Sequence, residues 1–141
     1  MACRCGGGPP CFVAPLIEVG PTLSQSERNV WVARSAKEYI EINFHHPVHL
    51  KDLSRHAGVG IRMVQRCFRE SFDTTITEFL KAVRLDAAYR ELAATYPDKT
   101  NVKQVALHNG FTHLGRFSEA YRQRFGELPS ETLAARPIKV Q

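Results

Sequence analysis

Apolar residues recur every three or four positions along most of the chain, which is the spacing of an amphipathic α-helix and not of a β-strand. The longest regular stretch, TITEFLKAVRLDAAYRELAA, covers residues 75–94 and predicts one long helix. Thr75 and Glu78 at its start have the spacing of a capping box, as do Ser24 and Glu27 at the start of an earlier helix. The inward face of that earlier helix is predicted to carry Val30, Ala33, Ala36, Lys37, Ile40 and Phe44. The pattern therefore predicts an all-α protein.

Two similar pieces of sequence flank the long helix. The first, LKDLSRHAGVGIRMVQRCF, covers residues 50–68, and the second, VKQVALHNGFTHLGRFSEAY, covers residues 102–121. Each has the pattern of a short helix, a turn at Gly58 or Gly110, and a second helix, which is the helix-turn-helix arrangement. Glycine suits such a turn because it adopts a positive φ without steric cost. A repeat on both sides of a connecting helix predicts two helix-turn-helix subdomains at a fixed spacing.

The second helix of the first module, from about Ile61 to Ser71, is predicted to have two chemically different faces. Its core face is formed by Val64, Cys67, Phe68 and Ser71. Its opposite face carries Arg62, Gln65, Arg66 and Arg69. An arginine fork matches guanine O6 and N7, and a glutamine amide pairs with adenine N6 and N7. An ordinary solvated face is the alternative, but within a helix-turn-helix module the stripe favours base reading.

The second helix of the second module, from about His113 to Arg124, gives a weaker signal. Phe117, Ala120 and Tyr121 are expected to face inward, while Gly115, Arg116 and Glu119 face outward. The missing side chain at Gly115 would let the backbone approach a base pair closely. Glu119 either accepts a hydrogen bond from cytosine N4 or is a solvated acid that repels nearby phosphate, and the sequence favours neither role.

Several polar residues around these helices are candidates for contact with a DNA backbone. They are Arg69, Thr75, Lys81, Arg84, His113 and Ser130. Ser130 follows Pro129 at the start of a short last helix, where backbone amides can hold a phosphate. The long helix spans roughly 30 Å at 1.5 Å per residue, close to one turn of B-DNA, about 34 Å. It is therefore long enough to place two reading helices in successive major grooves.

Composition and charge agree with a nucleic-acid partner. The chain has 141 residues, a formal net charge of +5 and a pI of about 9.2. A basic balance of this kind favours an anionic partner. No apolar run is long enough to cross a bilayer, and Pro15 and Glu18 interrupt the apolar stretch near the N-terminus. A cytoplasmic protein without membrane contact is expected, with its cysteines reduced.

Residues 1–23 are expected to form an irregular head or linker remnant, because their glycines and prolines oppose helix and strand alike. Cys3, Cys5 and Cys11 offer three thiolates, but a metal needs a fourth ligand and an ordered frame. No metal or cofactor is therefore predicted, and a DNA-binding thiol or metal sensor is kept as an alternative. The folded domain is expected over residues 24–135, with a first module at 24–74, a connecting helix at 75–95 and a second module at 100–135.

These segments resemble a known family. Similarity to the DNA-binding domain of AraC/XylS-type bacterial transcription regulators is carried by Gly110-Phe111 followed by GRFSEAYRQRFGELPSETL, by the earlier GVGIRMVQRCFRESF, and by Arg84-Leu85-Asp86-Ala87-Ala88. The resemblance covers about residues 28–133. It implies two helix-turn-helix subdomains joined by a long helix, with the second helix of each in a major groove. By the same resemblance, the base-reading positions are Arg62, Gln65 and Arg66 in the first copy and Gly115, Arg116 and Glu119 in the second, with Leu114 and Ser118 adjacent.

The resemblance also implies partners, namely double-stranded DNA, RNA polymerase, and a separate ligand-sensing or dimerisation domain N-terminal to this region. Two positions depart from the family pattern. Gly60 stands where the family often has a serine cap, and Asp73 replaces the glycine that Gly126 supplies in the second copy. Aspartate tolerates left-handed backbone geometry better than most residues.

An enzymatic alternative rests on His113-x-x-Arg116 followed by Tyr121. This pattern is similar to that of tyrosine recombinases, in which histidine and arginine activate a phosphate for attack by tyrosine. Tyr121, however, lies on the predicted core face, and in that family the tyrosine comes much further along the chain. We therefore predict a sequence-specific, DNA-binding transcription regulator that is not an enzyme.

Overall fold

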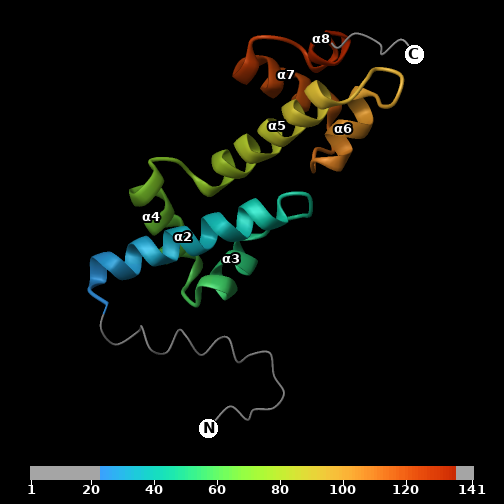
Figure 1. The fold of residues 1–141 in the computed structure, drawn as a ribbon. Coiled ribbons are helices and arrows are strands. Elements are labelled where there is room, and N and C mark those ends of the chain that lie inside the picture. The colour runs from blue at the N-terminus through green and yellow to red at the C-terminus, as the bar shows by residue number, and fades with distance from the viewer. Residues whose placement is uncertain (1–22, 136–141) are drawn as a thin grey trace, which may run out of the picture.

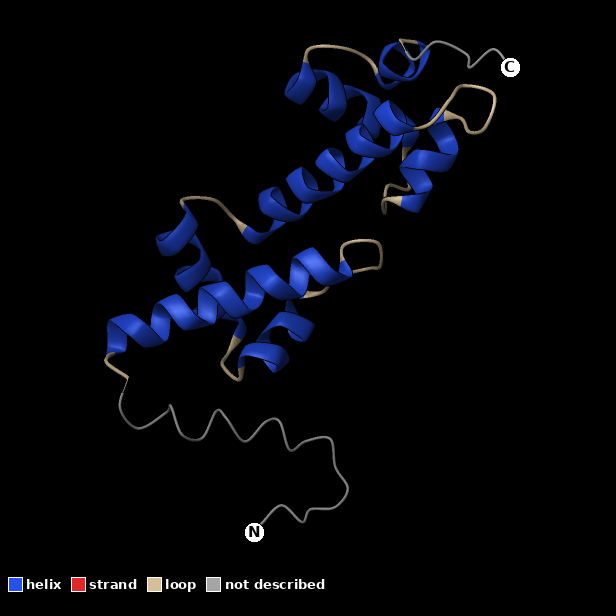
Figure 2. Cartoon of the chain, viewed as in Figure 1, coloured by secondary structure: helices blue, strands red, loops and turns tan. Residues whose placement is uncertain are grey.

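The computed structural model describes residues 23–135, and every regular element in this range is a helix (Figure 2). The helices are α2 (Gln25–Asn43), α3 (Leu50–Ala57), α4 (Ile61–Phe72), α5 (Ile76–Ala94), α6 (Val102–His108), α7 (Leu114–Phe125) and α8 (Pro129–Ala134). The predicted all-α fold is confirmed. Most of the predicted head lies outside the described residues. None of the described helices is both long enough and apolar enough to cross a membrane.

The connecting helix α5 joins two groups of helices (Figure 1). On one side α2 packs against α3 and α4, and on the other α6, α7 and α8 pack against one another and around the second half of α5. The pairs α3–α4 and α6–α7 occupy the positions of the two predicted helix-turn-helix motifs.

Each group of helices has its own buried core. The first consists of Val32, Ala33, Ala36, Ile40, Leu53, Ala57, Val64, Cys67, Phe68 and Ile76. The second consists of Leu85, Ala88, Leu92, Val105, Ala106, Phe117, Ala120, Tyr121 and Leu133. Helix α5 contributes its first half to one core and its second half to the other. Helices α4 and α7 therefore pack on separate cores that share α5.

Side-chain caps fix where the helices begin. The Ser24 hydroxyl accepts a hydrogen bond from the Glu27 amide at 3.2 Å, and the Ser24 amide donates to the Glu27 carboxylate at 2.8 Å. This reciprocal pair is the capping box expected from the sequence. The Thr75 hydroxyl accepts from the Glu78 amide at 3.1 Å and caps α5. Gly60, in contrast, gives α4 no side-chain cap.

Left-handed residues end three of the helices. Gly58 after α3 has a φ of 71°, and Gly126 after α7 has a φ of 79°. Asp73 after α4 has a φ of 52° and is the one non-glycine residue with a positive φ among residues 23–135. The repeat therefore keeps the same left-handed turn after both α4 and α7, although only the second copy has a glycine there.

Two residues assigned to the core by periodicity lie at the surface. Val30 is 45% exposed, and Ser71 is also exposed. Both line an open groove, together with Phe72, where the start of α2 passes the end of α4. The buried face of α2 is instead centred on Val32 and Ala36. The predicted helix is correct, but the start of α2 extends past the end of α4. The other helices therefore do not cover Val30.

Candidate nucleic-acid interface

The outward face of α4 consists of the four polar residues that the sequence predicts. Val64, Cys67 and Phe68 are buried on the inner side of the helix. Arg62, Gln65, Arg66 and Arg69 are all exposed on the other side. This separation leaves their hydrogen-bonding groups accessible to a partner that approaches α4 from outside.

Arg66 is held only loosely along the surface of α4. Its Nη2 lies 3.1 Å from the Met63 sulfur, and its Nε lies 4.0 Å from Glu70 Oε1. The side chains of Arg66 and Glu70 are 59% and 57% exposed, so this ion pair is weak in water. The guanidinium can therefore leave Glu70 for a base edge at little cost in free energy.

The outward face of α4 continues into a groove at the start of α5. This groove is lined by Gln65, Arg66, Arg69, Thr75, Ile76 and Thr77. Two predicted base-reading residues therefore share one concave surface with two predicted backbone contacts, Arg69 and Thr75. The N-terminal end of α5 also opens here, and the positive end of a helix dipole favours an anion. The arrangement suits a reading helix in a groove and an adjacent phosphate.

Helix α7 repeats this division with different residues. Phe117, Ala120 and Tyr121 are buried, as predicted, and Gly115, Arg116 and Glu119 are exposed. Gly115 is the second residue of α7, so it lies in the first turn and not in the helix interior. A Cβ built on Gly115 would meet no atom within 4 Å. The fold itself therefore does not require glycine at this position.

Lys81 on the connecting helix α5 lies beside α7. A groove between α5 and α7 is lined by Lys81, Phe111, Arg116, Glu119, Ala120 and Gln123. Gln123 Nε2 donates to Glu119 Oε1 over a long 3.5 Å, so the Glu119 carboxylate is only weakly held. Lys81 is exposed and lines the same groove as Arg116 and Glu119 of the outward face of α7.

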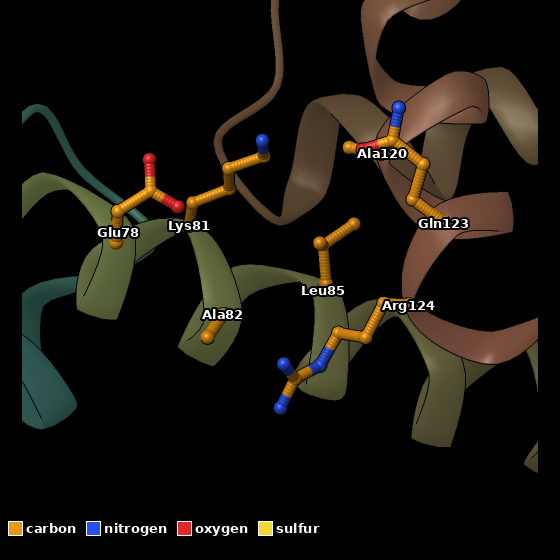
Figure 3. A pocket seen from close by; sticks show the side chains of 7 residues that line it. All are labelled: Glu78, Lys81, Ala82, Leu85, Ala120, Gln123 and Arg124. Atoms are coloured by element: carbon orange, nitrogen blue, oxygen red, sulfur yellow. The ribbon is translucent and has the colours of Figure 1, made fainter. Parts of the chain in front are cut away.

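A neighbouring groove shows how α7 is fastened to α5. It is lined by Glu78, Lys81, Ala82, Leu85, Ala120, Gln123 and Arg124 (Figure 3). Arg124 donates to both carboxylate oxygens of Asp86, through Nε at 2.8 Å and Nη2 at 2.9 Å. These hydrogen bonds raise the pKa of Arg124 above its ordinary value. Sequence reasoning missed this pair, because its two residues are 38 positions apart and no local spacing indicates it.

Arg84 is less available for contact with a DNA phosphate than the sequence suggests. Its Nε donates to the Phe44 carbonyl at 2.8 Å, and its Nη2 donates to the His46 carbonyl at 2.9 Å. The side chain is partly buried, and burial lowers the pKa of the guanidinium. Because two of its five N–H donors already bind backbone carbonyls of the same chain, Arg84 is not carried into the phosphate contacts proposed below.

The two remaining predicted backbone contacts, His113 and Ser130, are exposed. His113 precedes α7 as its N-cap residue, and Ser130 lies in the first turn of α8. The His113 side chain forms no capping hydrogen bond, and both residues stay predicted phosphate contacts. Cys3, Cys5 and Cys11 lie outside the described residues. Within residues 23–135, no three histidine, cysteine, aspartate or glutamate side chains are grouped to bind a metal.

Tyr121 is a core residue. Its side chain is fully buried, and its hydroxyl donates to Thr132 Oγ1 at 2.8 Å. Thr132 in turn donates to the Glu127 carboxylate. Burial raises the pKa of Tyr121 to about 12. A buried phenol that stays protonated and ties α7 to α8 is unsuited to attack a DNA phosphate.

Comparison with known proteins shows similarity to helix-turn-helix proteins and to operon regulators. Residues 53–135 match a family described as a helix-turn-helix domain. The probable thc operon regulatory protein of Rhodococcus erythropolis is 34% identical over 108 residues, which are 77% of this chain and 32% of that protein. XylDLEGF operon transcriptional activator 2 of Pseudomonas putida is 33% identical over 102 residues, which are 72% of this chain and 65% of that protein. The chain thus spans from about one third to about two thirds of these relatives.

A solved structure has the same fold. It is the crystal structure of a probable AraC family transcriptional regulator from Rhodopseudomonas palustris CGA009. The two chains superpose with a TM-score of 0.69 at 39% identity, over 75% of this chain and 98% of the other. The helices that carry the outward faces described above therefore belong to a shared architecture.

Proposed function

The chain belongs to the AraC-type family of helix-turn-helix transcription regulators, which are DNA-binding proteins and not enzymes, and from this we propose that it reads a specific duplex with both modules. In this proposal α4 and α7 enter successive major grooves on one face of the DNA. The observation that carries it is the outward face of α4, where four hydrogen-bonding side chains are exposed opposite a fully buried apolar face. Such a face has no packing role in the protein itself.

Base reading is assigned to the outward faces of the two helices. In the first module these residues are Arg62, Gln65 and Arg66, and in the second they are Gly115, Arg116 and Glu119. A good bidentate contact to a base edge discriminates by about 1–3 kcal/mol against a wrong base. The arginines and the glutamine of α4 suit such contacts, so we expect the first module to contribute most of the sequence preference.

Backbone contacts are assigned to residues that border these faces. They are Arg69, Thr75, Lys81, His113 and Ser130. Contacts of this kind fix the register of a protein on the duplex and release counterions, which makes binding salt-dependent. The groove shared by α4 and the start of α5 supports this assignment for Arg69 and Thr75.

The length of α5 fits the spacing that the proposal needs. The helix has 19 residues, which is about 28 Å at 1.5 Å per residue. Successive major grooves on one face of B-DNA are about 34 Å apart. Helices α4 and α7 are offset from α5, each within its own module. The distance between them can therefore differ from the length of α5 and match the spacing of the grooves.

Beyond DNA, we propose that the protein acts on transcription together with RNA polymerase and with a sensor domain. The support is that the relatives named as operon regulators are longer than the region matched here. The role proposed for the described residues themselves is DNA reading.

Selection of bound duplexes from a random DNA pool, sequenced at two salt concentrations, tests the proposal. We expect a bipartite motif whose two elements are about one helical turn apart. A single short element would mean that α7 grips backbone and does not read bases. Salt-sensitive binding without any motif would refute sequence-specific reading by this chain.

A further inference from the structure

The two modules are joined by more than the connecting helix. The loop that follows α2, residues 44–49, extends from the first module towards the end of α6 in the second (Figure 1). Its backbone carbonyls accept hydrogen bonds from Arg84 of α5, and its His45 side chain contacts His108 at the end of α6. This loop therefore provides a second link between the cores on which α4 and α7 are mounted.

Arg84 forms one half of the link. It lies in the middle of α5, between the residues that enter the first core and those that enter the second. Its guanidinium donates to the Phe44 and His46 carbonyls at 2.8 and 2.9 Å. Phe44 is the C-cap of α2, where the helix dipole concentrates negative partial charge. Hydrogen bonds from a charged donor to such carbonyls are stronger than neutral ones.

His45 and His108 form the other half. His45 Nδ1 lies 3.1 Å from the carbonyl oxygen of His108, and the two imidazole rings stack with centroids 5.1 Å apart. His108 is itself held, because its Nδ1 lies 2.9 Å from Glu91 Oε2 on α5. Buried Asn109 donates to the same carboxylate oxygen at 2.9 Å. The loop is thus anchored to α6 as well as to α5.

Gly110 shows that this link is tightly packed. A Cβ at Gly110 would lie 2.7 Å from Arg84 Nε and 3.1 Å from the Phe44 carbonyl oxygen. The turn of the second module therefore fits against the first module only because Gly110 has no side chain. The close contact runs through Arg84 and prevents the two modules from moving nearer to each other at this point.

We propose that Arg84 and His45 are positioning residues that brace the two modules and thereby restrict the spacing between the two DNA elements. The proposal rests on the proposed reading by both modules. Adding one base pair between two elements rotates the second by about 35° and moves it by about 3.4 Å. Hydrogen bonds of 2.8 and 2.9 Å do not survive a displacement of that size. An intact brace therefore opposes binding to a site with an altered spacer.

Measuring affinity for spacer variants of the selected duplex tests the brace. We compare the selected spacer with spacers one base pair longer and shorter, for the unmodified protein, Arg84→Ala and His45→Ala. The unmodified protein should bind the altered spacers much more weakly. Losing a hydrogen bond from a charged donor should reduce that penalty by about tenfold in Arg84→Ala. Arg84→Lys, which keeps the charge but not the fork, should restore part of the penalty.

Arg90→Ala is the matched control, because Arg90 is an exposed arginine on the same helix. It should leave the spacer penalty unchanged. If Arg84→Ala instead weakens binding to every duplex alike and lowers the salt slope by about one, Arg84 is a phosphate contact and the brace is refuted.

Measuring the distance between the two modules in the absence of DNA tests the brace independently of DNA reading. Spin labels at Glu38→Cys on α2 and Arg122→Cys on α7 occupy exposed positions in different modules. Cys3, Cys5 and Cys11 are replaced by Ser, and buried Cys67 is kept. Arg84→Ala and His45→Ala should broaden the distribution of distances between the labels. An unchanged distribution would refute the brace, even if both modules read DNA. A broadened distribution with a one-element binding motif would refute two-module reading alone.

Discussion

At the scale of single residues, the outward face of α4 differs from an ordinary charged surface in what its side chains bind. Arg66 has only a weak, exposed ion pair with Glu70, whereas Arg84 is committed to two carbonyls and Arg124 to a carboxylate. Arg66 is thus available to a partner, whereas Arg84 and Arg124 hold the fold together. Burial and partners, rather than charge, decide which arginines can reach DNA.

Replacing Arg66 by Ala should relax base preference. Loss of a bidentate base contact is expected to cost about 1–3 kcal/mol on the selected duplex and to remove discrimination at one base pair. Titration of the selected duplex and of its single-base variants measures both effects. Lys81→Ala is the comparison, since a lost phosphate contact should weaken binding to all duplexes alike and flatten the salt slope by about one. Equal losses on specific and random DNA for Arg66→Ala would contradict base reading.

Replacing Gly115 by Ala should separate stability from binding. The new methyl group meets no atom within 4 Å, and alanine favours a helix over glycine by at most about 1 kcal/mol. Thermal or urea unfolding should therefore show a protein that is equally or slightly more stable. If close approach of the backbone to DNA requires the glycine, affinity for the selected duplex should fall. Unchanged affinity would show that Gly115 does not approach the duplex.

At the scale of elements, most of what the sequence predicts concerns local order. Helix starts were found at Ser24 and Thr75, because a capping side chain binds an amide three residues away. The buried faces of α4 and α7 were found because burial follows the helical period, except at Ser71. The structural partners of Arg84 were not predicted, because a position off the apolar stripe does not reveal a partner such as Phe44, 40 residues distant.

Asp73 offers a test of the turn that follows α4. A left-handed backbone costs an L-residue about 1–2 kcal/mol, less for aspartate, and as the C-cap of α4 Asp73 adds a negative charge near the negative end of the helix dipole. Asp73→Gly should therefore raise the free energy of unfolding by about 0.5–1 kcal/mol after the entropy cost of glycine. Gly126→Asp in the second copy should have the opposite sign. Chemical denaturation of both variants decides, and a clear loss of stability in Asp73→Gly would contradict this account of the turn.

At the scale of the whole molecule, the design is two cores that share α5. The internal repeat predicts this organisation, because two copies of one motif need a connector to hold them at a fixed distance. The second link, from the loop after α2 to α6, was not predicted. It depends on residues such as His45 and His108, which are 63 positions apart and look like ordinary loop and helix-end residues in the sequence. Only the three-dimensional structure shows that these two histidines are in contact.

The most direct test of the central claim is dimethyl sulfate protection on the selected duplex, because the reagent methylates guanine N7 in the major groove. Two groups of protected guanines, about one helical turn apart on one face of the DNA, are predicted. Arg66→Ala should expose guanines in only one group, and Arg116→Ala in only the other. Protection confined to a single groove, or loss of both groups in either variant, would contradict reading by two helices in successive major grooves.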